Sequence, residues 1–302
     1  MVLKHLSELK DILVDKPTRR LVLAAAQDQT SLTSVISAAR DGYIEPILVG
    51  DKEAIQIIAS ENNLDISGVR MIHEPDTEVA VEIAVKMVRS NQADILMKGK
   101  VGTSTLLKAV LNKEWGLRTG TLLSHIAIFE VEAYHKLIAV TDVAMNIAPN
   151  LQDKIAIVNN SVACLNKLGV ELPKVAVLGA VEMVSENMQA TLDAALLSKM
   201  NQRDQIKHCI IDGPLAFDNA ISLDSAIHKG IRSDVAGDTD LLLMPDIEVG
   251  NVLYKSLVFF AHAKVAAVIL GAMVPIVLTS RSDSDQAKYD SILLAAAVTK
   301  NA

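Results

Sequence analysis

The chain has 302 residues, of which half are hydrophobic and only 3% aromatic, and its formal net charge is -7. This length exceeds the size at which one hydrophobic core usually stops growing, so we expect two domains. The acidic balance argues against nucleic acid as a partner, and no apolar run reaches the roughly 18 residues that a membrane-spanning helix needs. We therefore expect a protein that binds neither nucleic acid nor a membrane.

Short apolar runs alternate along the chain with segments of helical period, and Gly, Pro, Asp and Ser lie at the joints between them. The predicted strands are residues 20–25, 45–51, 93–99, 122–130, 135–142, 174–180, 208–213, 240–246, 266–271 and 275–280. The predicted helices are residues 31–44, 51–64, 103–114, 151–169, 189–200, 250–263 and 287–298. Two of these strands, 122–130 and 135–142, are separated by a short polar turn and predict an antiparallel pair. The rest predicts an α/β fold with mostly parallel sheets.

No Pro-, Gly- or Ser-rich linker separates the two expected domains. We place the boundaries near Asp142 and Val268. Residues 1–142 and 268–302 then form an N-terminal α/β domain that is completed by the C-terminal segment, and residues 143–267 form the second α/β domain.

Cysteine and histidine usage indicates a reducing compartment and no metal centre. Cys164 and Cys209 lie in apolar contexts without CxxC spacing, as is typical of reduced core thiols in a cytoplasmic protein. The seven histidines show no paired metal-ligand spacing, so we expect no metal. His125, within an apolar run, is interpreted as a core or edge histidine with its hydrogen bonds satisfied, and the alternative is a ligand-binding histidine.

Open α/β sheets bind ligands beyond the carboxyl ends of their strands, so chemistry is expected at the joints that follow strands. The first such joint, residues 97–105, contains two glycines together with Lys98 and Lys100. Thr103 or Ser104 is expected to cap the following helix, whose free N–H groups face an anion. The alternative is a glycine turn with solvated lysines.

The second and third joints carry further candidate ligand contacts after buried strands. These candidates are Asp212, Gly213, Pro214, Pro245, Asp246, Gly250, Asn251 and Lys255. Asp-Gly-Pro predicts a turn, and the Gly-Asn pair permits a close backbone approach or a positive φ. The alternative for each joint is a structural turn, with Asp218 capping a helix after the second.

The fourth joint, residues 280–285, alternates serines with one arginine and two aspartates. Arg281 can fork onto phosphate oxygens, and the hydroxyl of Ser280 can donate to the same oxygens. The alternative is a capping segment in which Ser284 or Asp285 opens the last helix.

The joints, taken in order, resemble the phosphate acetyl/butyryltransferase family over almost the whole chain, and the butyryl branch more than the acetyl branch. The similarity lies in "ILMKGKVGTSTLLKAVL", "TDVAMNIAP", "DGPLAFDNAIS", "GDTDLLLMPDIEVGNVLYKSL" and "GAMVPIVLTSRSDS". The resemblance implies reversible transfer of a short acyl group between coenzyme A and inorganic phosphate. It also implies the two-domain isocitrate/isopropylmalate dehydrogenase-like fold with an interdomain cleft, a homodimer or larger homo-oligomer, and coenzyme A as a substrate with no resident cofactor.

The resemblance also implies residue roles. Ser280 and Arg281 match the family's serine and arginine, which bind the phosphate oxygens and the charge that develops in the transition state. Asp283 or Asp285 is either the base that takes the proton of the coenzyme A thiol or a cap of the last helix. Lys108 stands where the acetyl branch has an arginine. The residues expected to contact phosphate are then Lys98, Lys100, Thr103, Ser104, Lys108 and Arg118. The candidates of the second and third joints are expected to line the cleft and to contact coenzyme A.

A direct transfer in a ternary complex is expected, because Cys209 lies within an apolar strand and the sequence has no activated nucleophile. The nearest alternatives are a phosphate acetyltransferase and an enzyme that uses another acyl-CoA or an acyl carrier protein. A protein of another class, a metal-dependent dehydrogenase, would need clustered aspartates and a nucleotide-binding loop, and this sequence shows neither. A non-catalytic binding domain of the same fold is opposed by the Ser280 and Arg281 pair.

Overall fold

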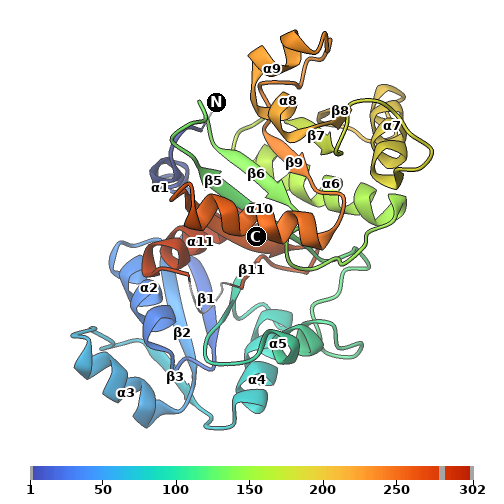
Figure 1. Cartoon of the computed structure of the whole chain (residues 1–302). Coiled ribbons are helices and arrows are strands. Elements are labelled where there is room, and N and C mark those ends of the chain that lie inside the picture. The colour runs from blue at the N-terminus through green and yellow to red at the C-terminus, as the bar shows by residue number, and fades with distance from the viewer. Residues whose placement is uncertain (1–2, 279–282, 300–302) are drawn as a thin grey trace. The chain divides into compact units, whose positions relative to one another are not determined.

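The computed structural model describes residues 3–278 and 283–299, so the predicted catalytic residues Ser280 and Arg281 lie outside the described residues. Its contacts group into two compact units, each drawn in Figure 1. Unit 1 contains Met1–Glu8 and Leu122–Val265, and unit 2 contains Leu9–Thr121 and Ala266–Ala302.

Unit 2 is built on a mostly parallel sheet with the strand order β3-β2-β1-β4-β11-β10. The strands are β1 (Arg19–Ala24), β2 (Ile44–Gly50), β3 (Arg70–His73), β4 (Ile95–Lys98), β10 (Lys264–Leu270) and β11 (Ile276–Val277). β1 runs parallel to both β2 and β4, β11 runs parallel to β4, and only the β10–β11 pair is antiparallel among these. Leu21, Val22 and Leu23 of β1 are fully buried, which explains the continuous apolar run of this central strand.

Three helices of unit 2 start at an aspartate side chain that caps them. The helices of this unit are α1 (Leu9–Leu13), α2 (Gln29–Arg40), α3 (Lys52–Glu61), α4 (Thr77–Arg89), α5 (Thr103–Val110) and α11 (Asp285–Val298). Asp28, Asp51 and Asp76 accept hydrogen bonds from free N–H groups in the first turns of α2, α3 and α4. α11 packs on α2.

Unit 1 is built on a sheet with the order β5-β6-β9-β7-β8. The strands are β5 (Ser124–Glu130), β6 (Ile138–Thr141), β7 (Lys174–Leu178), β8 (Ile210–Leu215) and β9 (Leu241–Leu243). β5 and β6 are antiparallel, while β6, β9, β7 and β8 are parallel neighbours. Leu243 is in register with Thr141 on one side and Val177 on the other, so the loops that follow three strands start side by side.

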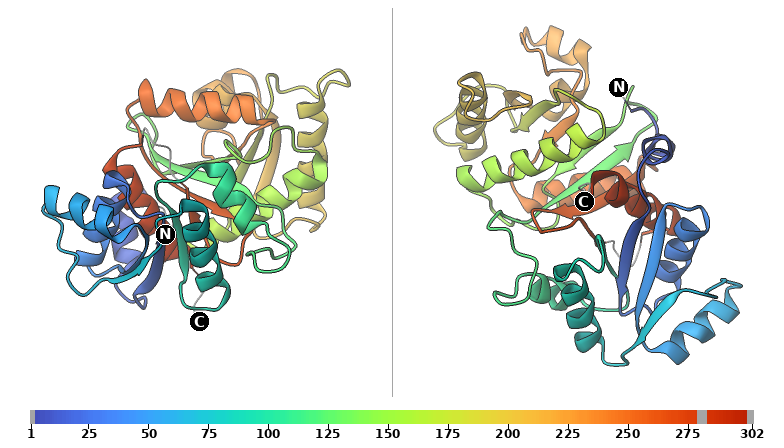
Figure 2. Two further views of the ribbon diagram at one scale, coloured as in Figure 1. Left: turned by 90° about the horizontal axis from the view of Figure 1, so that it is seen from below. Right: turned by 180° about the vertical axis from the view of Figure 1, so that it is seen from behind.

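Helices cover both faces of the unit 1 sheet. They are α6 (Leu151–Lys167), α7 (Gln189–Gln202), α8 (Phe217–Ile221), α9 (Leu223–His228) and α10 (Ile247–Phe259), with the short 3-10 turn η1 (Leu6–Glu8) at the N-terminus. Figure 1 shows α10 in front of β5 and β6, and the view from behind in Figure 2 shows α6 on the opposite face. Asn150 and Asp153 form a capping box that starts α6.

The structure confirms the predicted α/β class, the mostly parallel sheets and the antiparallel pair. Several elements were not predicted, namely β3, α4, α8 and α9. Two predicted bounds were wrong: Asp-Gly-Pro lies inside β8 rather than in a turn after it, and α10 starts at Ile247 rather than at Gly250.

The contact units change over at residues 121/122 and 265/266, whereas we predicted domain boundaries near Asp142 and Val268. The first difference arises because β5 and β6 extend the sheet of unit 1 through the parallel β6–β9 pair. The division into domains itself stays a prediction.

Cys164 and Cys209 are free and buried, as predicted. Within the described ranges, none of the helices combines the length and apolar character needed to span a membrane.

Candidate active site

The first predicted site segment follows β4 in unit 2. The N–H groups of Gly99 and Lys100 donate to the carbonyls of Ala24 and Ala25, so the segment crosses the carboxyl end of β1. A Cβ on Gly99 would lie only 2.2 Å from the Ala25 carbonyl oxygen, which explains why glycine occupies this position. The ammonium of Lys98 is buried and donates to the carbonyls of Gly99 and Val101 at 3.2 and 3.3 Å.

The start of α5 differs from the prediction. Its N-cap is Gly102, not Thr103 or Ser104, and this helix terminus has no side-chain cap. No side chain at the start of α5 therefore accepts a hydrogen bond from the N–H groups of its first turn, and an anion that binds there requires such N–H groups. A helix terminus alone does not make a binding site. Thr103 and Ser104 are exposed.

The remaining cations predicted for phosphate binding lie on the surface of unit 2. Lys100, Lys108 and Arg118 are all exposed, and the Arg118 backbone forms an isolated antiparallel bridge with Ala272. Lys98 is thus the buried member of this predicted set, and the other three ammonium and guanidinium groups are open to solvent.

In unit 1, the predicted Asp212, Gly213 and Pro214 all belong to β8. The carboxylate of Asp212 accepts a hydrogen bond from the Gly213 N–H at 2.8 Å. A Cβ on Gly213 would approach the Val177 carbonyl oxygen to 2.6 Å, so this glycine allows β8 to pack closely on β7. Asp218 does not cap α8; it forms an ion pair with Lys229 at 3.1 Å.

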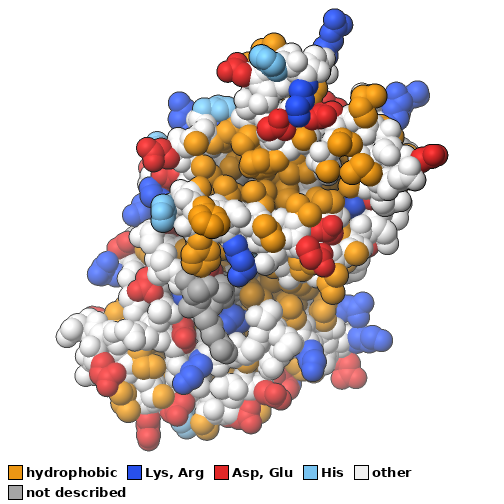
Figure 3. All heavy atoms as spheres, in the orientation of Figure 1, with side chains coloured by type: hydrophobic (Ala, Val, Ile, Leu, Met, Phe, Trp, Pro, Cys, Tyr) orange, Lys and Arg blue, Asp and Glu red, His pale blue; other side chains and the backbone are white. Residues whose placement is uncertain are grey.

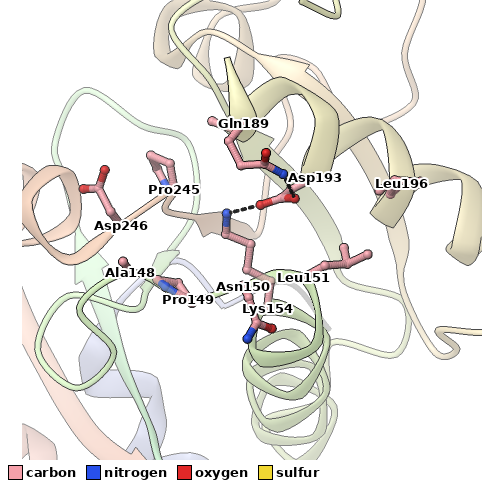
Figure 4. Close-up of a pocket in the computed structure, with 11 residues that line it drawn as sticks. Ala148, Pro149, Asn150, Leu151, Lys154, Gln189, Asp193, Leu196, Pro245 and Asp246 are labelled. Carbon is pink, nitrogen blue, oxygen red and sulfur yellow. Dashed lines mark hydrogen bonds and ion pairs between the residues drawn. The ribbon is translucent and has the colours of Figure 1, made fainter. Parts of the chain in front are cut away.

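A pocket of about 520 Å³ opens at the carboxyl ends of β6, β9 and β7 in unit 1 (Figure 4). Its lining includes Pro245 and Asp246, two of the residues predicted to contact coenzyme A. The other lining residues are Ala148, Pro149, Asn150, Leu151, Lys154, Gln189, Ala190, Asp193 and Leu196. Because the three strands are parallel neighbours, their C-terminal loops meet at one edge, where open α/β sheets bind ligands. The volume falls within the range of about 300–1,000 Å³ that is usual for ligand sites.

The polar part of this pocket is a buried ion pair. The Lys154 ammonium on α6 lies 2.6 Å from the Asp193 carboxylate on α7, and the two side chains are only 5% and 3% exposed. Gln189 donates a further hydrogen bond to Asp193 at 2.8 Å. Figure 4 shows these three groups converging between the two helices, with Pro245 and Asp246 on the opposite side. The pocket therefore offers mostly apolar walls and a few fixed polar groups.

α10 starts at the rim of this pocket. The Asp246 carboxylate caps it by accepting from the Val249 N–H at 2.9 Å. Gly250 allows the close approach that we predicted, since a Cβ there would lie 2.4 Å from the Asp142 carbonyl oxygen. Asn251 donates to the Val143 carbonyl at 3.3 Å. These contacts hold α10 against the loop that follows β6.

That loop is organised by Asp142, a buried carboxylate. It accepts hydrogen bonds from the backbone of His125, Ala144 and Met145 and from the Asn146 amide. Saturation with donors explains how a carboxylate can be buried at the end of a strand.

His125 on β5 is buried, as predicted, but its ring is not fully satisfied. The buried Nδ1 atom has no hydrogen-bond partner among the described residues, so the prediction of a satisfied core histidine was wrong on this point. Burial lowers the pKa of His125, although the neighbouring Asp142 carboxylate acts in the opposite direction. The ring is therefore neutral near pH 7.

The last predicted site segment ends at α11. The Ser284 hydroxyl caps this helix by accepting from the Ala287 N–H at 3.1 Å, while Asp285 is exposed in the first turn. The Asp283 carbonyl accepts from the Lys288 ammonium at 2.9 Å. Ser284 thus has the capping role, which leaves the side chains of Asp283 and Asp285 outside it.

Sequence reasoning missed the residues that shape unit 1, namely Asp142, Lys154, Gln189 and Asp193. Lys154 and Asp193 lie 39 residues apart on different helices, and nothing in their local patterns connects them. Within the ranges that the structure describes, no group of three His, Cys, Asp or Glu side chains is placed to hold a metal ion.

Comparison with known proteins identifies the class. Residues 77–296 match the family described as "Phosphate acetyl/butaryl transferase". The chain is 46% identical over 295 residues to the phosphate butyryltransferase of Clostridium beijerinckii, covering 98% of both chains. The crystal structure of a branched-chain phosphotransacylase from Enterococcus faecalis V583 superposes with a TM-score of 0.82 at 35% identity, covering 93% of this chain and 99% of that chain.

A more distant structure bears on the fold alone. A 4-hydroxythreonine-4-phosphate dehydrogenase from Burkholderia phymatum superposes with a TM-score of 0.56 at 14% identity, covering 95% of this chain and all of that one. The predicted dehydrogenase-like α/β fold is thereby confirmed. The protein is an acyltransferase enzyme. It belongs to the phosphate acetyl/butyryltransferase family.

Proposed function

We propose that the protein transfers a short acyl group reversibly between coenzyme A and inorganic phosphate, with butyryl-CoA as the preferred acyl donor. The observation that carries this proposal is the similarity to a phosphate butyryltransferase along nearly the whole chain. In the forward reaction a phosphate oxygen attacks the thioester carbonyl, the carbon–sulfur bond breaks, and an acyl phosphate and the coenzyme A thiolate are released. The thiol has a pKa of about 8.5, like that of cysteine, so it leaves without strong acid catalysis.

We propose direct transfer within a ternary complex. An acyl-enzyme would require an activated nucleophile, and both cysteines are poor candidates. Burial raises the pKa of Cys164 to about 12 and that of Cys209 to about 11. Both thiols are therefore protonated and inaccessible at neutral pH.

The residue roles stay proposals that rest on the family resemblance. Ser280 and Arg281 would bind phosphate and the charge that develops on the carbonyl oxygen, and Asp283 or Asp285 would take the thiol proton in the reverse direction. The cations Lys98, Lys100, Lys108 and Arg118 would hold phosphate oxygens, with Thr103 and Ser104 at the free start of α5. Asp212, Gly213, Pro214, Gly250, Asn251 and Lys255 would contact coenzyme A.

We further propose that the unit 1 pocket takes part of the pantetheine arm of coenzyme A. This arm combines a dimethyl group with two amides and a hydroxyl, which suits apolar walls carrying the carboxamides of Asn150 and Gln189. The predicted coenzyme A contacts Pro245 and Asp246 line the same pocket.

The first experiment measures free thiol released from acetyl-, butyryl- and longer acyl-CoA, with and without phosphate. Because both cysteines of the protein are buried, their thiols should not react with the reagent that detects free coenzyme A thiol. We expect phosphate-dependent release, with kcat/KM at least about tenfold higher for butyryl-CoA than for acetyl-CoA, as a pocket that fits the two extra methylenes produces. Release from no acyl-CoA would refute the proposed reaction. A preference for acetyl-CoA or for an acyl carrier protein would instead favour the corresponding alternative.

The second experiment tests the guanidinium. Arg281→Ala should lower turnover by orders of magnitude, because it removes a charge contact that is strongest in the transition state. Arg203→Ala is the matched control, since Arg203 is an exposed arginine at the C-cap of α7. Equal turnover of the two variants would remove Arg281 from the mechanism.

The third experiment fills the pocket. Ala148→Trp places a large ring in its wall and should raise the KM for butyryl-CoA while leaving the KM for phosphate unchanged. Ala133→Trp serves as the control, because Ala133 is exposed in the turn before β6, at the opposite end of that strand from the pocket. A KM for butyryl-CoA unaffected by Ala148→Trp would place the arm elsewhere.

The setting of the enzyme is also proposed. Its substrates are small molecules, with coenzyme A turned over rather than held as a resident cofactor. Intracellular coenzyme A and the reduced, buried cysteines support a cytoplasmic location. A homodimer or larger homo-oligomer is the proposed assembly.

A further inference from the structure

The segment "TDVAMNIAP", residues 141–149, is one of the motifs behind the family resemblance, yet its polar side chains have no place in the proposed reaction. Thr141 is fully buried, Asp142 is only 3% exposed and Asn146 is half-buried. Buried polar groups need hydrogen-bond partners. All three side chains find partners at the start of β5, within residues 123–125.

These hydrogen bonds fasten the carboxyl end of β6, and the loop after it, to β5. The Thr141 hydroxyl donates to the His125 carbonyl at 2.7 Å, and the His125 N–H donates to the Asp142 carboxylate at 3.1 Å. The Asn146 amide donates to the Leu123 carbonyl at 2.9 Å and to the Asp142 carboxylate at 2.6 Å. Asp142 lies at the centre of this arrangement, because it bonds to both the strand and the loop.

Asp142 uses both of its carboxylate oxygens. Oδ2 accepts from the His125 N–H and the Asn146 amide. Oδ1 accepts from the N–H groups of Ala144 and Met145, each at 2.9 Å. One oxygen therefore turns the loop, and the other ties the turn to β5. An asparagine side chain has only one acceptor oxygen, so at this position its NH2 group would face two other donors.

The loop leads directly into the lining of the unit 1 pocket. Ala148 and Pro149 line the pocket and follow Ile147 in the chain. The Ile147 carbonyl accepts from the Ile247 N–H at 3.0 Å, and Asp246, the residue before Ile247, also lines the pocket. This hydrogen bond thus joins two parts of the lining, both of which are labelled in Figure 4. The path of the loop therefore sets where these parts of the lining lie.

α10 holds the same loop through its inward side. Gly250 abuts the Asp142 carbonyl, and the N–H of Met244, shortly before the helix, donates to the Thr141 carbonyl at 2.7 Å. The outward side of α10 is left uncovered, since Val252 is 65% exposed and Figure 3 shows hydrophobic side chains gathered over this part of unit 1. The contacts of α10 with the loop therefore belong to the inward side that attaches the helix to unit 1.

We propose, on the basis of the proposed placement of the pantetheine arm in this pocket, that Asp142 is a positioning residue for coenzyme A. It fixes the loop whose end forms part of the pocket lining, so the pocket has its shape before the arm enters. A lining that is already ordered removes the cost of ordering it on binding. Phosphate should not depend on Asp142 in this way, because its predicted contacts in the described residues belong to unit 2.

The main test is Asp142→Asn, which keeps the size of the side chain but removes one acceptor oxygen. The KM for butyryl-CoA should rise about tenfold, while kcat and the KM for phosphate stay within about twofold of wild type. A side chain that is needed only for folding would instead lower the active fraction of the protein, and hence kcat, at an unchanged KM.

Asp76→Asn is the matched control. Asp76 also accepts from the N–H groups two and three residues further along the chain, at 2.8 and 3.2 Å, but it uses a single oxygen and starts α4 in unit 2. Asparagine can keep both of these hydrogen bonds. We therefore expect the kinetic constants of the wild type for this variant.

Calorimetric titration with coenzyme A alone measures the same effect without turnover. The Kd should rise about tenfold in Asp142→Asn. This reading does not require acyl transfer, so a missing reaction would refute the proposed function and leave the role of Asp142 to be decided by the Kd. Far-UV circular dichroism checks that the variant is folded. If it is not, Asn146→Ala replaces it, because this variant loses only the amide contacts to Leu123 and Asp142, and its Kd should rise about threefold.

A folded Asp142→Asn protein that binds coenzyme A as tightly as the wild type would overturn the proposal. A KM for phosphate that rises in parallel, a kcat that falls alone, or an equal loss of affinity in Asp76→Asn would also overturn it. Where Asn146→Ala is used, an unchanged Kd has the same meaning. A wild-type protein that does not bind coenzyme A would likewise contradict a positioning role for Asp142.

Discussion

The buried ion pair between Lys154 and Asp193, which lines the unit 1 pocket, should make a large contribution to stability that is lost when either partner is replaced alone. Lys154 and Asp193 lie 2.6 Å apart with almost no exposure, and the Gln189 amide donates a further hydrogen bond to the carboxylate. Lys154→Met leaves the Asp193 charge buried with one amide donor. Breaking a buried pair in this way costs about 3–5 kcal/mol, which corresponds to a fall in melting temperature of roughly 10 °C.

The assay is thermal and urea unfolding followed by far-UV circular dichroism. Replacing both partners, as Lys154→Met with Asp193→Leu, should recover most of the loss, because no uncompensated charge then remains. The exposed pair of Lys86 and Glu82 on α4 provides the comparison, and Lys86→Met should cost no more than about 0.5 kcal/mol. The reasoning is refuted if Lys154→Met costs less than about 1 kcal/mol, or if the double variant loses as much as the two single variants together.

Two further predictions concern a pH-dependent ion pair and a tightly packed glycine. Burial acts to raise the pKa of Asp94, but the hydrogen bonds and charge of Arg20 outweigh it and hold the pKa below its usual value. The ion pair therefore contributes its full stabilisation at pH values above the unfolded pKa of about 3.9, and this contribution is lost as the pH falls. Asp94→Asn should lower the free energy of unfolding by about 1 kcal/mol at pH 7 and by less at pH 3. Urea unfolding at both pH values checks this, and an equal cost at both would contradict it. Gly250→Ala should destabilise the protein by about 1–3 kcal/mol, because the new methyl group would clash with the Asp142 carbonyl. Without this clash, alanine would favour the helix over glycine by about 1 kcal/mol. A gain in stability would therefore show that α10 can shift to relieve the clash.

The sequence predicted the strands well wherever they are buried on both faces. β1 and β4 are apolar runs bounded by polar joints, and such runs depend only on local composition. β3 was missed because its four residues, starting at Arg70, are exposed or half-buried and carry no continuous apolar run. Asp-Gly-Pro predicted a turn by local propensity, but pairing with β7 keeps these residues within β8.

The candidate site residues stay predictions, but the structure shows where they lie. Position after a strand pointed to Pro245 and Asp246, and both line the unit 1 pocket. The same reasoning gave Thr103 or Ser104 as the cap of α5, whereas the structure has Gly102 without a side-chain cap. Such a choice between adjacent residues is decided by the backbone path, here the crossing of Gly99 over the end of β1.

The sequence by itself determined the α/β class and the family, because apolar periodicity and the order of short motifs are properties of neighbouring residues. It also placed the cap of α11 within one residue, at Ser284 or Asp285. Only the tertiary structure decided that Lys154 meets Asp193 and that one side of α10 is left uncovered. Both depend on which distant segments pack together, and a local pattern cannot distinguish an apolar helix that its own chain covers from one whose outward side stays exposed.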